Sequence, residues 1–129
     1  MAAEMQGAAN GRDVANALLV MAQGQGKASE ILSHADAMTD VTGFGLAGHL
    51  KGICEASGTG ATLNLGDIPV LPGALELAKK GQRSSLFAAN QASVAVDVEP
   101  SPHAGLVLDP PTAGGLLAAV DHDAAEEAI

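Results

Sequence analysis

Apolar residues recur every three to four positions in several parts of the chain, which is the spacing of helices with one buried face. The first such segment starts at Arg12. The same spacing resumes after the glycine-containing stretch 24–26 and continues to Ala35, so we expect two helices or one broken helix. The range 44–56 predicts another helix, because Gly58 follows it as glycine follows many helix ends.

Two further helices are predicted closer to the C-terminus. Pro72 suits the first turn of a helix that runs to Gly81. The range 121–129 begins a last helix, with Asp123 near its positive end. At the start of the helix over 44–56, the hydroxyl of Thr42 is a candidate N-cap that would accept a bond from a free first-turn amide.

Short apolar or alternating runs predict strands between these helices. The predicted strands cover 36–42, 61–65, 93–98, 106–108 and 116–120. Helices and strands in this mixed order predict an α/β (α+β) fold, a mixed β-sheet packed by helices. We expect residues 1–11 to be a loose N-terminal segment and 12–129 to form one domain.

Composition limits the core and the binding partners. Of the 129 residues, 26 are alanine and only two are aromatic, so the core must consist of small side chains. Because small side chains bury little apolar area, we expect the domain to be stabilised by packing against another protein surface. The net charge of −9 argues against binding to nucleic acid, whose phosphates need Lys and Arg, and against an anionic membrane surface. One cysteine, no secretory signal and no apolar run of membrane-spanning length predict a soluble cytoplasmic protein.

The range 43–48 reads G-x-G-x-x-G after a predicted strand, and Asp67 follows about twenty residues later. This spacing occurs in dinucleotide-binding domains, where the glycines admit a pyrophosphate and the acid meets a ribose. The chain contains 16 glycines, so the same pattern arises readily by chance, and close helix packing is the competing explanation.

Asp40 is the sharper candidate. It lies between a short predicted strand and a glycine-rich helix start, where the backbone at Thr42 and Gly43 could approach an anion. A Mg²⁺ ion held by Asp40 could bridge to nucleotide phosphates. The competing hypothesis is that Asp40 only caps a turn through local hydrogen bonds.

Other reactive residue types give weaker signals. The four histidines have no metal-ligand spacing, and His49 is typical of a half-buried, hydrogen-bonded side chain. Cys54 shares the apolar face of the same helix, where a cysteine is usually inert. The basic cluster Lys79, Lys80 and Arg83 suits a solvated helix end better than a phosphate clamp.

Four segments, in order, resemble the selenophosphate synthetase (selenide, water dikinase) family. Residues 39–50, TDVTGFGLAGHL, are similar to its TDVTGFGLLGHL signature. Residues 68–74 resemble LPLLPGA, 83–90 resemble RSSLYPAN, and 106–117 resemble LLFDPQTSGGLL. Related ATP-using enzymes of the aminoimidazole ribonucleotide (AIR) synthetase superfamily carry different sequences in place of the first of these segments. TDVTGFG therefore indicates the selenophosphate synthetase branch of that superfamily.

The resemblance implies an AIR synthetase-like C-terminal domain and a reaction in which ATP, selenide and water give selenophosphate, AMP and phosphate. It implies that Asp40 is a Mg²⁺ ligand whose companions belong to an N-terminal domain absent from this sequence. That domain also carries the catalytic cysteine or selenocysteine and its lysine, so no catalytic residue is assigned here. The resemblance also implies that the parent enzyme is a homodimer. Against the family pattern the chain looks truncated at both ends.

Two departures from the family pattern keep an alternative open. Pro111 and Ala113 stand where the family usually has Gln and Ser, which removes an amide and a hydroxyl from the loop over 109–115. The alternative is a non-catalytic binding or interaction module that retains the fold. The dinucleotide-binding domain is a third hypothesis, and it predicts a parallel strand–helix–strand unit with Asp67 facing a ribose.

Overall fold

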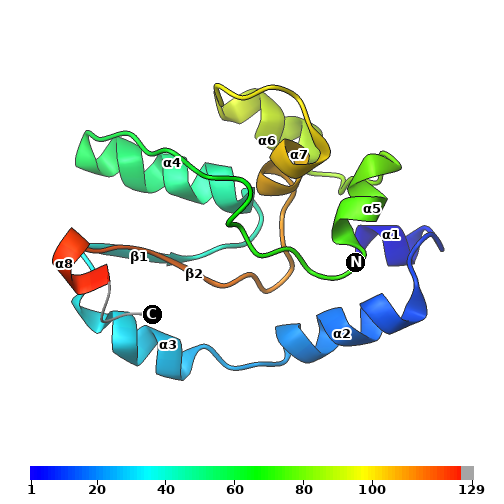
Figure 1. The fold of residues 1–129 in the computed structure, drawn as a ribbon, viewed down its shortest axis with the longest axis horizontal. Helices are drawn as coiled ribbons and strands as arrows, with labels where there is room; N and C mark the ends of the chain where they lie inside the picture. The colour runs from blue at the N-terminus through cyan, green and yellow to red at the C-terminus, as the bar shows by residue number, and fades with distance from the viewer. Residues whose placement is uncertain (126–129) are drawn as a thin grey trace.

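The structure, a computed structural model, describes residues 1–125 and shows short helices around one small sheet (Figure 1). The helices are α1 (Ala2–Met5), α2 (Gly11–Met21), α3 (Gly26–Ile31), the 3₁₀ helix η1 (Leu32–His34), α4 (Gly45–Ser57), α5 (Ala74–Lys79), α6 (Phe87–Ser93), α7 (Pro102–Leu108) and α8 (His122–Ala125). The strands are β1 (Ala37–Asp40) and β2 (Leu116–Ala119). The chain is therefore an α/β protein, as predicted.

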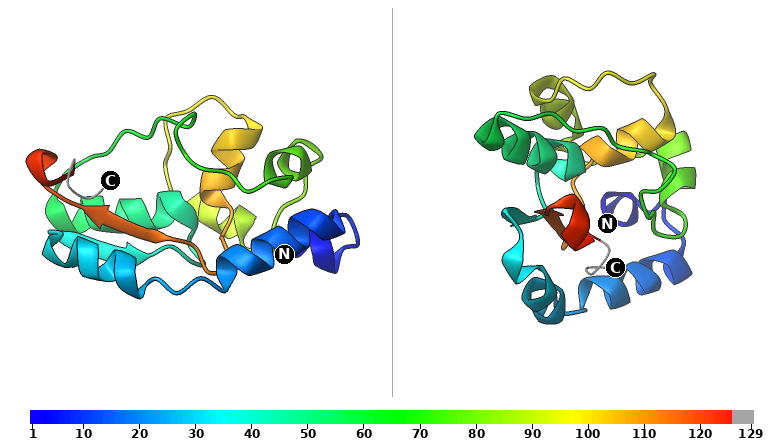
Figure 2. Two further views of the ribbon diagram at one scale, coloured as in Figure 1. Left: turned by 60° about the horizontal axis from the view of Figure 1, so that its bottom comes forward. Right: turned by 60° about the vertical axis from the view of Figure 1, so that its left-hand side comes forward.

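The two strands form an antiparallel pair in which Ala37 lies opposite Ala119 and Asp40 lies opposite Leu116. Helix α4 packs against β2, while α3 lies on the other side of the strand pair (Figures 1 and 2). Because β1 leads directly into the turn before α4, the pairing fixes the point at which that turn begins.

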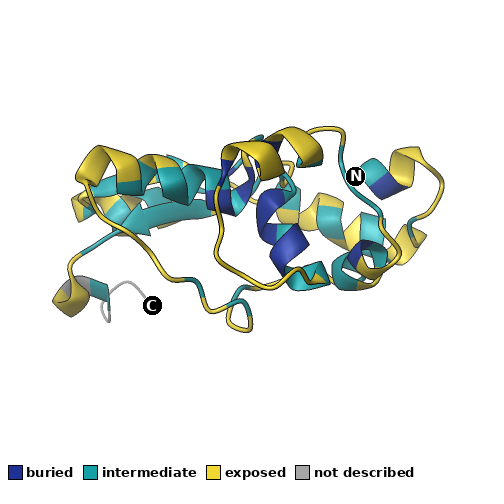
Figure 3. Cartoon of the chain, turned by 90° about the horizontal axis from the view of Figure 1, so that it is seen from above, coloured by how far each residue is buried: buried dark blue, intermediate teal, exposed yellow. Residues whose placement is uncertain are grey.

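Few residues of the chain are buried (Figure 3). The core that they form is small and consists of short side chains, as the alanine-rich composition predicts. Its buried members are Ala47, Val94, Val107 and Leu108, with Leu46, Leu65, Ile68 and Phe87 packed around them. Helix α7 contributes two of the buried members and packs on both α4 and α5. The core therefore lies directly behind the start of α4.

Helix α2 begins at Gly11, one residue before the predicted start at Arg12, and α4 ends just before the predicted glycine, Gly58. The side chain of Asn10 caps α2 by accepting a bond from the Arg12 amide at 2.9 Å. Gly58, at φ 65°, ends α4 in the left-handed conformation that favours glycine. The break at 24–26 separates α2 from α3, which confirms the two-helix alternative.

Several expected elements were wrong. The ranges 61–65 and 93–98 are not strands: Ser93 ends α6, and in the described residues neither segment lies beside a strand with which its backbone could pair. The range 106–108 belongs to α7, since Ser101 caps that helix by accepting from the Ala104 amide at 3.1 Å and Pro102 occupies its first turn. Helix α6 was not predicted.

Thr42 does not act as the predicted side-chain N-cap of α4. Phe44 occupies that position, and the carbonyl of Thr42 accepts from the amide of Gly45 at 3.1 Å. At the C-terminus, α8 agrees with the start of the predicted last helix, and the rest of that prediction lies outside the described residues. Within residues 1–125 no helix has the length and apolar character needed to cross a membrane.

Candidate functional site

Asp40 is the last residue of β1, and its side chain is exposed. In the part of the chain that the structure describes, no group forms a hydrogen bond or ion pair with its carboxylate. The same residues contain no cluster of three or more His, Cys, Asp or Glu that could hold a metal ion. Asp40 can therefore offer one carboxylate to a metal, but the described residues do not complete a site.

The imidazole of His49 lies beside the turn that follows Asp40. Its Nε2 accepts a hydrogen bond from the amide of Thr42 at 3.0 Å. Its Nδ1 lies 3.5 Å from the hydroxyl of Thr39, and that hydroxyl donates to the carbonyl of Asp40 at 3.1 Å. The ring meets Phe44 edge to face with centroids 5.6 Å apart. His49 is thus a half-buried, hydrogen-bonded side chain, as the sequence indicates.

Asn90 holds the next residue of the turn from the opposite side. Its side-chain amide donates to the carbonyl of Gly43 and to the carbonyl of Leu108, each at 2.9 Å. Asn90 is only 5% exposed and is the buried polar residue of the described core. One side chain on α6 therefore joins the turn to the end of α7.

The loop over 109–115 also packs against the start of this turn. The amide of Val41 donates to the carbonyl of Gly115 at 2.9 Å, and Gly114 lies so close to the carbonyl of Val41 that a Cβ there would overlap it. Asp109 accepts a bond from the amide of Ser84 at 3.0 Å. Three of the four segments that carry the family resemblance therefore meet around Asp40.

Gly45 allows the turn to approach α7. It has φ 70°, and a Cβ at this position would lie 2.9 Å from the carbonyl atoms of Leu108. Gly48 is similarly restricted, because its Cβ would meet the side chain of Phe44 at 2.7 Å. These glycines serve close packing, which is the competing explanation for the G-x-G-x-x-G pattern.

The dinucleotide-binding hypothesis is wrong for the described residues. It requires a parallel strand–helix–strand unit, whereas β1 pairs only with the antiparallel β2 and the segment 61–65 is not a strand. The carboxylate of Asp67 accepts a hydrogen bond from the side-chain amide of Asn64 at 2.6 Å, within a local turn. In the sequence Asp67 is far from the ends of both described strands.

The basic residues do not form one cluster. Lys79 pairs with Glu76 on the surface at 2.7 Å, and Lys80 is exposed. Arg83 turns inward, donates to the carbonyls of Ala78 and Gln82, and stacks 4.9 Å from the Phe87 ring centroid. These contacts of the basic residues are structural.

Cys54 is a half-buried free thiol in α4.

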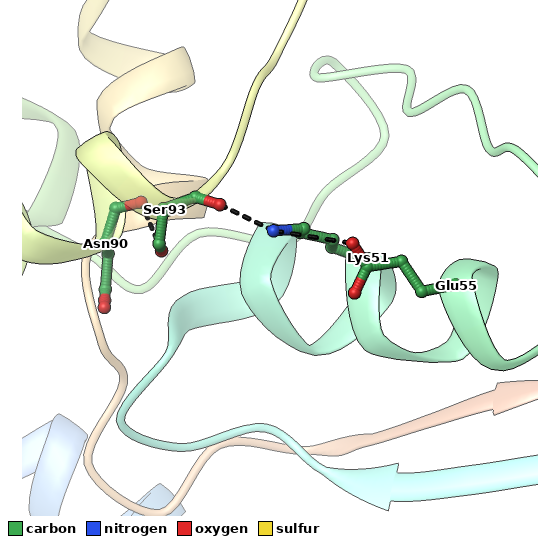
Figure 4. Close-up of polar contacts among 4 residues, drawn as sticks. All are labelled: Lys51, Glu55, Asn90 and Ser93. Carbon is green, nitrogen blue, oxygen red and sulfur yellow. Dashed lines mark hydrogen bonds and ion pairs between the residues drawn. The ribbon is translucent and has the colours of Figure 1, made fainter.

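Lys51 ties α4 to the end of α6 (Figure 4). Its ammonium group donates to the carbonyl of Ser93 at 2.7 Å and lies 3.6 Å from the carboxylate of Glu55. A cation at a helix C-terminus is favourable because the last carbonyls carry partial negative charge. The contact keeps α6, and with it Asn90, beside the turn.

Sequence reasoning had assigned no role to Asn90 and no specific contact to His49. Both residues lie inside the segments that resemble the family, so their positions were marked. Asn90 donates to the carbonyls of Gly43 and Leu108, and His49 accepts from the amide of Thr42. These partners are backbone groups that the residue pattern does not reveal.

Comparisons with known proteins agree with this arrangement. The model of the family "AIR synthase related protein, C-terminal domain" matches residues 1–129. Selenide, water dikinase of Dechloromonas aromatica is 40% identical over 103 residues, covering 76% of this chain and 30% of the relative. The protein of the same name from Shewanella sp. strain ANA-3 is 41% identical over 96 residues, covering 73% of this chain and 27% of the relative.

A selenide, water dikinase of Escherichia coli O157:H7 is 43% identical over 93 residues, 70% of this chain and 27% of the relative. This chain spans less than a third of the length of these relatives. The matched family model, the identities and the three converging segments around Asp40 agree on one assignment. The chain belongs to the AIR synthase related family and corresponds to the C-terminal domain of selenophosphate synthetases.

Proposed function

We propose that this chain supplies Asp40 as a Mg²⁺ ligand to an active site shared with an N-terminal domain, in an enzyme that makes selenophosphate from ATP, selenide and water. The observation that carries the proposal is the exposed carboxylate at the end of β1, which has no partner within residues 1–125 and lies on a turn held by neighbouring helices. A carboxylate that only capped its own turn would be occupied by backbone amides.

The residues present fit one part of a magnesium site. Mg²⁺ is commonly held by one or two protein carboxylates together with phosphate oxygens and water, so a single exposed carboxylate is a reasonable contribution. When bound, the metal would neutralise polyphosphate charge during phosphoryl transfer. The companion carboxylates and the selenide-handling residue would belong to the N-terminal domain, so the chain alone should be inactive.

The turn after Asp40 would lie beside the nucleotide phosphates. The amide of Thr42 donates to Nε2 of His49 at 3.0 Å, and the hydroxyl lies farther from that nitrogen, at 3.5 Å, so we assign the phosphate-facing role to this hydroxyl and to the backbone of Gly43. Gly43 is suited to close approach because its missing side chain leaves only Leu86 nearby, 3.9 Å from the position of a Cβ. We place this chemistry in the cytoplasm, which agrees with the single free cysteine.

The test is titration calorimetry with Mg-ATP on the chain alone and after adding a separately expressed N-terminal domain of a related selenide, water dikinase. We expect heat and turnover only on mixing, and their loss in Asp40→Asn. Asp36→Asn is the matched control, because Asp36 is also exposed and lies just before the same strand. Undiminished turnover with Asp40→Asn would refute the metal role.

The non-catalytic module is the second candidate. One observation favours it: Pro111 and Ala113, which depart from the family pattern, are both exposed on the loop that flanks the turn, where they offer neither a side-chain amide nor a hydroxyl. If the two domains form a complex on mixing, but the heat of Mg-ATP binding to the complex does not exceed that of either domain alone, this candidate is the correct one.

A further inference from the structure

Within residues 1–125 no hydrogen bond or ion pair fixes the side chain of Asp40, so its position depends on the backbone on either side. Thr39 precedes it and Thr42 follows two residues later. The same imidazole reaches both, with Nδ1 3.5 Å from the Thr39 hydroxyl and Nε2 3.0 Å from the Thr42 amide. His49 therefore spans the turn that presents Asp40.

The direction of these bonds determines the tautomer. A backbone amide can only donate, so Nε2 must accept and carries no proton. In a neutral imidazole the proton is then on Nδ1, which faces the Thr39 hydroxyl. That hydroxyl passes its own hydrogen to the Asp40 carbonyl at 3.1 Å. The bonds run in one consistent direction from the ring to the backbone of Asp40.

The ring itself is held by its surroundings. His49 lies one turn into α4, is half-buried, and meets the Phe44 ring edge to face at an interplanar angle of 61°. The start of α4 is in turn fixed by Gly45 against α7. The imidazole therefore contacts the turn from a helix whose start packs closely on α7.

We propose that His49 is a positioning residue for Asp40, acting as the neutral Nδ1–H tautomer that holds the Thr39–Thr42 turn in its metal-presenting form. The inference rests on the proposed function of Asp40 for its consequence, but the tautomer can be tested without it. Both ring nitrogens face groups of the turn, so His49 is assigned neither as a metal ligand nor as a general base.

The first measurement uses the ¹⁵N-labelled chain as it is. We expect the long-range ¹H–¹⁵N pattern of an Nδ1–H imidazole for His49, and a scalar coupling across the hydrogen bond between the Thr42 amide nitrogen and Nε2. An Nε2–H pattern or the absence of this coupling would overturn the proposal, whatever Asp40 does.

The second measurement compares two variants. His49→Gln can place an acceptor oxygen near the position of Nε2, whereas His49→Phe has a ring of similar size and no acceptor. Exchange of the Thr42 amide with solvent should become faster in His49→Phe and return toward its original rate in His49→Gln. His34→Gln, at an exposed position, is the matched control and should leave this rate unchanged.

The third measurement is the Mg²⁺ dependence of turnover with the added N-terminal domain. Groups that orient a metal ligand typically change metal affinity by ~10–100-fold, so His49→Phe should need that much more Mg²⁺ and His49→Gln should recover most of the loss. If Asp40→Asn abolishes the Mg²⁺ response while His49→Phe leaves it unchanged, the positioning role is wrong and the proposed function stands. If Asp40→Asn changes nothing, the proposed function fails independently of the tautomer.

Discussion

The side-chain amide of Asn90 donates a hydrogen bond to the carbonyl of Gly43 at 2.9 Å across 47 positions of sequence. Its second hydrogen goes to the carbonyl of Leu108 at the same distance. A single buried side chain on α6 thus satisfies two backbone acceptors, one in the turn after Asp40 and one at the end of α7. Removing it would leave both carbonyls without this donor, the Leu108 carbonyl at a buried position and the Gly43 carbonyl at a partly buried one.

Replacing Asn90 should therefore destabilise the fold. Loss of a donor to buried acceptors costs about 1–3 kcal/mol, so Asn90→Ala should lower the free energy of unfolding by that amount. Asn90→Asp should lower it further near neutral pH, because a buried carboxylate cannot donate and would face two carbonyl oxygens. Urea unfolding measures both. Gln91→Glu, on the same helix but exposed, is the control and should change stability little.

Gly45 and Gly52 form a matched pair within α4. Gly45→Ala should destabilise by about 1–3 kcal/mol, because a Cβ at φ 70° is strained and would press on the backbone of Leu108. Gly52 has an open position with nothing within 4 Å of a Cβ. Gly52→Ala should stabilise by about 0.5–1 kcal/mol, because alanine favours the helix. Thermal unfolding that showed equal effects at the two sites would contradict the contact between α4 and α7.

The loop beside Asp40 offers a second pair, Gly114 and Gly115. Gly114→Ala should cost about 1–3 kcal/mol, since its Cβ would overlap the carbonyl of Val41 and push the loop away from the turn. Gly115→Ala meets open space and should leave the unfolding midpoint nearly unchanged. Chemical shifts of the Val41 amide, which donates to Gly115, would report whether the loop has moved.

The surface pair of Glu76 and Lys79 gives a pH prediction. The hydrogen bond from Lys79, and then its charge, hold the pKa of Glu76 below its ordinary value of 4.5. A lowered pKa in the folded state means that any stabilisation is complete above the ordinary pKa and is lost as the pH falls through the folded value. NMR titration of the Glu76 carboxyl should give a midpoint below 4.5, and Lys79→Met should raise it.

The stability effect of this pair should be small because both side chains are exposed to water. Glu76→Gln should unfold at the same denaturant concentration as the original chain at pH 7. A clear loss at that pH would mean that the pair contributes more than an exposed ion pair does.

The sequence by itself determined where two of the main helices lie, what kind of side chains fill the core, and where Asp40 stands. The helical spacing from Arg12 predicted α2, and the spacing over 44–56 with Gly58 after it predicted α4, because one-sided apolar faces and glycine helix ends depend on neighbouring residues. The alanine-rich composition predicted a core of small side chains. The stretch 36–42 predicted a short strand before the glycine-rich helix start, and Asp40 is the last residue of that strand.

Only the tertiary structure decided which alternating segments became strands and which side chains support Asp40. The segments 61–65 and 94–98 have strand-like sequences, but a strand needs a neighbour to receive its backbone hydrogen bonds, and none lies beside them in the described fold. His49 and Asn90 find their partners among backbone groups of the turn after β1, which α4 and α6 bring within reach. Every residue has such backbone groups, so the sequence does not mark which ones a distant side chain will contact.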